Sequence, residues 1–182
     1  MSNKMSNKAS PSEVANFFLV KAKNEKKPIT IMKLLKLVYI GYGWCIAILR
    51  EPIFDEPIQA WKFGPVIPSL YHEFKSYGPK PIDRLSANIH FNSLDDDVEY
   101  IEVPIIENEE IIKVLNKVWN HYKDYTAIQL SNITHRPNSP WSFAYAQSKN
   151  TINPALNNDE IEKISRKKIL EIIDCEKNGI YR

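Results

Sequence analysis

The stretch "TIMKLLKLVYIGYGWCIAIL", residues 30–49, decides the fold predicted for this chain. Its apolar residues recur every three or four positions, the period of an α-helix, and most of the remaining positions are apolar too. A helix that is apolar on nearly every side is buried among other helices. Gly41 and Gly43 each cost about 1 kcal/mol of helix propensity, so Trp61 or a neighbouring helix is expected to pack closely there.

Helices are predicted on both sides of this central segment. Ser10 and Glu13 form a capping box around Pro11, which opens a helix ending near Glu25. Further amphipathic helices are predicted at residues 109–122, 125–134, 140–145 and 157–176. The fold class is therefore mainly α: six or seven helices in a single helical-bundle-like domain, residues 11–182, around the central buried helix at about 30–49. Residues 1–10 are predicted to be a mobile tail.

A second notable stretch, "WKFGPVIPSLYHEFKSYG" (residues 61–78), combines aromatic residues with rigid backbone residues. Gly64 can adopt conformations closed to other residues, and Pro65 and Pro68 both suit the first turn of a helix. Gly78 and a following proline then end that helix. A turning corner explains each glycine and proline, but not why Trp61 precedes the turn, so contact with a partner is the alternative.

Residues 79–109 are the least helical part of the sequence. Two short strands are predicted, at residues 89–91 and 99–103, with a surface turn at Asp95–Asp97. We therefore expect a small β-hairpin or an extended excursion between the flanking helices.

Charge and composition exclude several classes of protein. The 182 residues carry 24 basic and 22 acidic side chains, a net charge of +2 that disfavours a nucleic-acid binder. The N-terminus lacks the apolar run of a signal peptide, and the apolar run 37–49 is shorter than the roughly twenty residues that span a bilayer. Cys45 and Cys175 form no C-x-x-C pair. A soluble cytoplasmic protein without a membrane partner is expected.

The sequence contains no complete catalytic or metal-binding motif. His72-Glu73 lacks the second histidine of a zinc-protease motif, and the four histidines share no ligand spacing. Phosphate-binding and nucleophile-elbow motifs are absent as well. No catalytic, cofactor-binding or metal-binding residues are therefore predicted, and no cofactor is expected.

The segment "YTAIQLSNITHRPNSPW", residues 125–141, is the second informative cluster. His135 ends a predicted helix, where its ring can donate to free carbonyl groups or interact with the helix dipole. Ser139 and Pro140 open the next helix, and Trp141 can fill core space while its N–H finds a carbonyl. A structural role is favoured for both residues, and partner contact is the main alternative.

Three segments together carry a resemblance to a known family: the helix "MKLLKLVYIGYGW", the W-x-F-G-P-V-x-P-x-L-Y segment and the L-S-x-x-T-H…P-W segment. In order and spacing they resemble the Panacea domain of SocA-like and GepA-like phage-associated proteins, over about residues 12–148. The helix at about 157–176 matches only in being helical. The family's motif positions, as scaffold or partner contacts, correspond to Trp61, Gly64, Pro65, Val66, Pro68, Leu70, Tyr71, Leu130, Thr134, His135, Pro140 and Trp141.

The resemblance implies an antitoxin of a toxin–antitoxin system, which neutralises a cognate protein toxin encoded nearby by binding it. It also implies a proteolytic adaptor role as one form of this activity, with a ClpXP-type protease as the second partner. The motif residues are then scaffold, and the toxin-binding surface lies in residues 79–109 or the C-terminal helix. Two alternatives stay open: an enzyme with a pocket near Trp61 and His135, and a DNA-binding autorepressor. Homo-oligomers are compatible with all of these.

Overall fold

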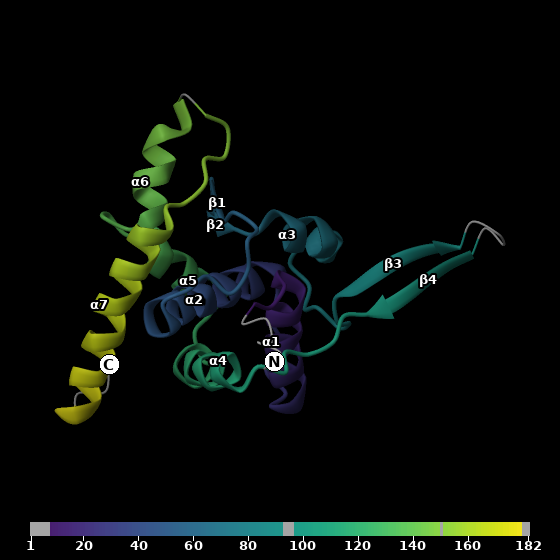
Figure 1. Ribbon diagram of the computed structural model, residues 1–182, viewed down its shortest axis with the longest axis horizontal. Helices are drawn as coiled ribbons and strands as arrows, with labels where there is room; N and C mark the ends of the chain where they lie inside the picture. Colours follow the sequence, from purple (N-terminus) through teal and green to yellow (C-terminus); the bar gives the residue numbers. More distant parts are fainter. Residues whose placement is uncertain (1–7, 93–96, 150, 180–182) are drawn as a thin grey trace, which may run out of the picture.

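The computed structural model describes residues 8–92, 97–149 and 151–179, in which helices surround a central helix, α2 (Figure 1). The helices are α1 (Pro11–Asn24), α2 (Ile31–Leu49), α3 (Pro68–Phe74), α4 (Glu109–Tyr122), α5 (Ala127–Thr134), α6 (Pro140–Ala146) and α7 (Asn158–Lys177). Short 3-10 helices follow α3 and α6, at Lys75–Tyr77 and Gln147–Lys149. Two hairpins complete the described structure: β1 (Gln59–Trp61) with β2 (Gly64–Val66), and β3 (Ala87–Asn92) with β4 (Asp97–Glu102). The predicted mainly α fold is confirmed.

Helix α2 is buried along almost its whole length because α1, α4, α5 and α7 pack against it. By length and composition α2 could cross a membrane, but 78% of its apolar window is buried inside the fold. Burial of this kind is typical of the core helix of a helical domain. The helix is longer than the apolar run at 37–49, because it begins directly after its cap, Thr30.

The predicted helix starts are confirmed in atomic detail. Ser10 Oγ accepts from Glu13 N at 3.2 Å, and Glu13 Oε2 accepts from Ser10 N at 2.6 Å, the reciprocal pair of a capping box. Single caps begin α6 and α7, where the Ser139 side chain accepts from Ser142 N and the Asn157 side chain accepts from Asp159 N and Glu160 N. Of the predicted mobile tail, residues 1–7 lie outside the described residues, whereas Ala9 N donates to a carbonyl at Ile53, 2.7 Å away.

The glycines of α2 are explained by neighbouring helices. A Cβ atom on Gly41 would lie 2.8 Å from Leu115 Cδ2 of α4, and one on Gly43 would meet Ser165 and Ile161 of α7. These contacts let the helix axes approach closely, which offsets the low helix propensity of glycine. The expectation that a neighbouring helix packs there is correct, and the alternative expectation of Trp61 is wrong.

The corner at residues 61–78 holds a hairpin that was not predicted. Pro65, expected in the first turn of a helix, lies instead in β2 opposite Ala60, and α3 begins at Pro68. Gly64 has a φ of 110°, a conformation that glycine adopts and other residues avoid, and it turns the chain from β1 to β2. The N–H of Ala60 donates to Pro154 O at 2.8 Å and so points away from β2. Ala60 and Pro65 therefore exchange no hydrogen bond, and the missing N–H of Pro65 costs no bond between the two strands.

The predicted hairpin within residues 79–109 is confirmed. Strands β3 and β4 pair in antiparallel register from Ala87 with Glu102 to Asn92 with Asp97. The hairpin extends away from the helices (Figure 1). The predicted turn at Asp95–Asp97 falls mostly outside the described residues, and Asp97 opens β4.

Candidate functional site

The two motif segments, residues 61–71 and 130–141, meet over α2. Strand β2 packs against α2 and α5, and β1 packs against α6. A hydrogen bond joins the segments directly, because Trp141 Nε1 donates to Trp61 O at 2.9 Å. We call Lys36, Trp61, Gly64, His135 and Trp141 the central cluster. It is the candidate site of the chain.

Lys36 of α2 forms the base of the central cluster and is only 2% exposed. Its Nζ atom donates to Pro65 O at 2.9 Å, which fixes β2 on the helix. Burial lowers the pKa of the Lys36 ammonium to about 7, because loss of water disfavours the charged form. The sequence reading did not include this residue in the site. The signal was present, since a lysine in a helix that is apolar on every side cannot reach solvent easily.

Because Gly64 has no side chain, Lys36 and His135 can occupy the space beside its Cα atom. A Cβ atom at this position would lie 2.7 Å from His135 Cε1 and closer still to Lys36 Nζ. Real Cβ atoms do not approach other heavy atoms so closely, so glycine is required here for packing as well as for its positive φ. Lys36 and His135 therefore share the space that a side chain at position 64 would fill.

His135 caps the C-terminal end of α5, as the sequence indicated. Its Nδ1 atom lies 2.6 Å from Ser131 O, a carbonyl that can only accept, so Nδ1 carries the hydrogen. The ring centroid lies 4.3 Å from that of Trp141. His135 thus joins the end of α5 to the first turn of α6.

Aromatic rings extend from the central cluster toward the surface. Trp141 stacks on Tyr145 with ring centroids 4.6 Å apart and planes 17° apart. On the other side, Trp61 meets Tyr71 edge to face at 4.8 Å, and its Nε1 donates to Gln59 Oε1. The polar atoms of both tryptophans are therefore satisfied inside the protein.

The predicted motif positions divide into two groups by exposure. The buried positions are Gly64, Pro65, Val66, Leu70, Leu130, Thr134 and Pro140. The half-buried positions are Trp61, Pro68, Tyr71, His135 and Trp141. The structure brings both motif segments together, and the buried group supports the half-buried aromatic rings. The half-buried positions keep part of their surface exposed.

The chemistry available at the central cluster is limited to two neighbouring basic groups, Lys36 and His135. Within residues 8–92, 97–149 and 151–179, no three histidine, cysteine or acidic side chains are grouped to hold a metal ion. A hollow of about 400 Å³ between α6 and α7 is lined by Phe143, Gln147 and Glu160, among others, and by neither Trp61 nor His135. The hollow is thus separate from the pocket that the enzyme alternative requires.

The chain belongs to the family of SocA-like antitoxins with a Panacea domain, because residues 34–142, more than half of its length, match that family. A similar protein is Antitoxin SocA of Caulobacter vibrioides (strain NA1000 / CB15N), 31% identical over 129 residues. The match covers 70% of this chain and 66% of that relative, just under two thirds of the relative's length. No solved structure matches the chain.

The matched range contains the whole central cluster, from Lys36 to Trp141. It also contains both hairpins. Helix α1 precedes it, and α7 follows it.

Proposed function

We propose that this chain is an antitoxin that neutralises a cognate protein toxin, encoded beside it, by binding that toxin directly. The observation that carries the proposal is the family match over residues 34–142. The 31% identical relative is itself named an antitoxin. The proposed activity needs a folded binding surface and no turnover.

The geometry supports a division between scaffold and binding surface. Among the described residues, every fully buried side-chain nitrogen or oxygen has a hydrogen-bond partner, so the cluster presents no unpaired buried group to a ligand. The cluster instead fixes the β1–β2 hairpin and α6 on α2. Toxin recognition is then expected on outer elements, and β3–β4 and α7 both lie on the outside of the helical body (Figure 1).

An adaptor role is the further form of this proposal. An antitoxin that also binds a ClpXP-type protease would shorten the lifetime of its toxin, whereas simple sequestration would leave that lifetime unchanged. The toxin's half-life in cells with and without the protease separates these two forms. Either form places the chain in the cytoplasm with its toxin.

The experiment that tests the proposal uses the product of the adjacent gene. That product should arrest growth when expressed alone, and co-expression of this chain should restore growth. The two purified proteins should form a stable complex in EDTA, because binding rests on protein surfaces. Dissociation by EDTA, or rescue that requires covalent modification of the toxin, would contradict direct binding.

An enzyme is the second candidate function, because the central cluster places a buried lysine with a lowered pKa near a histidine. Groups of this kind are often catalytic. His135→Ala distinguishes the two functions. If the role of His135 is limited to its hydrogen bond with the Ser131 carbonyl at the end of α5, the variant should lose about 1 kcal/mol of unfolding free energy and keep toxin rescue.

Thermal melts run beside the rescue assay provide the measurement for His135→Ala. A variant with an unchanged melting temperature and intact toxin binding, but without rescue, would favour the enzyme. His72→Ala is the matched control, since His72 is an exposed histidine close to the same tryptophan, Trp61.

A further inference from the structure

The β3–β4 hairpin, with residues 87–92 and 97–102 described, forms an arm that is separate from the helical core. Within the described part of the chain, its strands pair with each other and with no other strand, in a two-stranded sheet. The arm projects beyond α1 and α3 (Figure 1). Both outer edges of such a ribbon have backbone groups without a strand partner, and these are the groups through which strands join a binding partner.

One buried side chain of α1 holds both ends of the arm. The Asn16 amide nitrogen donates to Val103 O at 2.7 Å and to Ser86 O at 3.3 Å, and its oxygen accepts from Ser86 N at 2.7 Å. Ser86 directly precedes β3, and Val103 directly follows β4. Because Asn16 is fully buried, these bonds are shielded from competing water.

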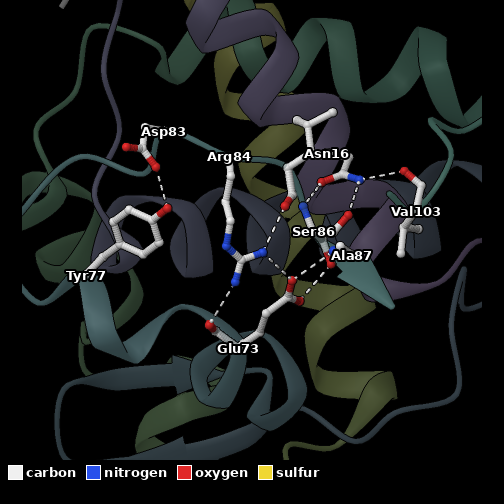
Figure 2. Close-up of polar contacts among 9 residues, drawn as sticks. Asn16, Glu73, Tyr77, Asp83, Arg84, Ser86, Ala87 and Val103 are labelled. Atoms are coloured by element: carbon white, nitrogen blue, oxygen red, sulfur yellow. Dashed lines mark hydrogen bonds and ion pairs between the residues drawn. The ribbon is translucent and has the colours of Figure 1, made fainter. Parts of the chain in front are cut away.

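A second contact ties the arm to α3 (Figure 2). Glu73 accepts from Ser86 Oγ at 2.7 Å and from Ala87 N at 3.1 Å, and it forms an ion pair with Arg84 at 3.2 Å. Arg84 also lies over the ring of Phe74, 5.0 Å from its centre. The base of the arm is therefore attached to two helices, which sets the direction in which the arm projects. A pre-oriented element loses less conformational freedom when it binds.

The charge of the arm differs from that of the rest of the chain. Residues 87–102 hold five of the 22 acidic residues and none of the 24 lysines and arginines, so the remainder carries a net charge of about +7. On the arm Glu99 and Glu102 are exposed. The exposed Ile101 lies on the same face of β4 as Glu99 and adds apolar surface there, and Glu102 lies on the opposite face. A mixed acidic and apolar surface is complementary to a basic surface with apolar contacts.

We propose that the β3–β4 arm is the element that binds the toxin, and that it docks against a basic surface of that protein. The inference rests on the proposed antitoxin function and specifies the surface and the chemistry of the partner. Glu99 and Glu102, on the two faces of β4, pair with lysine or arginine residues of the toxin, and Ile101 fills an apolar contact. Helix α7, which carries several lysines, is the competing surface.

Charge reversal on the arm tests the proposal, with the neighbour-encoded protein as the probe. The double variant Glu99→Lys with Glu102→Lys should weaken the complex by at least about tenfold, because like charges then face each other. Glu99→Gln with Glu102→Gln should weaken it less, and this variant keeps the test valid if the lysine variant unfolds. The wild-type affinity should also fall as salt rises from about 50 to about 500 mM.

The matched control is the same double reversal on α7, Asp174→Lys with Glu176→Lys, at two exposed positions of its last turns. This control should bind like the wild type, and all variants should keep the wild-type melting temperature. Wild-type binding by the arm variants, or an equal loss in the α7 control, would overturn the inference and leave the antitoxin function standing. If the wild-type chain neither binds nor rescues, the proposed function fails and the inference fails with it.

Discussion

Gly64→Ala is expected to lower the free energy of unfolding by about 2–5 kcal/mol. Two physical effects combine at this position. The φ of 110° strains any residue with a Cβ atom, and the added methyl group would overlap Lys36 Nζ and His135 Cε1. Because His135 and Lys36 are each held by a hydrogen bond, neither can move away freely. Urea unfolding at neutral pH provides the measurement.

Gly78→Ala is the matched control for Gly64→Ala. Gly78 also has a positive φ, 54°, but a Cβ atom there would meet nothing within 4 Å. It should therefore lose only the strain, about 1–2 kcal/mol. Equal losses in the two variants would show that the packing of Lys36 and His135 against Gly64 contributes nothing.

Between pH 6 and pH 10.5, the wild type is expected to gain on the order of 4 kcal/mol in free energy of unfolding relative to the Lys36→Met variant. The folded-state pKa of Lys36 is about 7, and its ordinary value is 10.5. Between these values the unfolded chain binds a proton that the folded chain lacks. Wild-type stability therefore gains from Lys36 as pH rises from about 7 to 10.5, and the full cost of burying the charge is present below pH 7.

The methionine variant lacks this titration, so it should be the more stable protein at pH 6. Near pH 10.5 it should be slightly less stable than the wild type, because the hydrogen bond to Pro65 O is lost. Lys117→Met on α4 is the control, since Lys117 is exposed. If the free energy of unfolding changed with pH in the same way for the wild type and the Lys36→Met variant, the lowered pKa of Lys36 would be contradicted.

The local sequence determined most of the helices. Ser10, Thr30 and Ser139 satisfy helix N–H groups within three residues, so their role can be recognised without knowing the fold. The arm was also predictable, because its strands are close in sequence and pair with each other. The resemblance to the Panacea family identified the motif segments that meet in the structure.

The β1–β2 hairpin and the role of Lys36 depend on distant contacts. Pro65 suits a helix start equally well by local preference, and its place in β2 depends on the bond of Ala60 to Pro154, about ninety residues away. The apolar pattern of α2 indicates that Lys36 is buried, but it does not indicate which segments cover it. Those segments, β2 and α5, are brought together by tertiary packing, which local patterns do not describe.

Asn16 has a consequence for how the family domain should be delimited. The matched residues begin at position 34, yet the amide that holds both ends of the arm belongs to α1. Ser165, which packs on Gly43, likewise belongs to α7 beyond the matched range. A fragment trimmed to residues 34–142 would keep every motif position. It would lack Asn16, which bonds to both ends of the arm, and it would expose the side of α2 that α7 covers. We therefore expect the folding unit of this chain to extend from the capping box at Ser10 through α7.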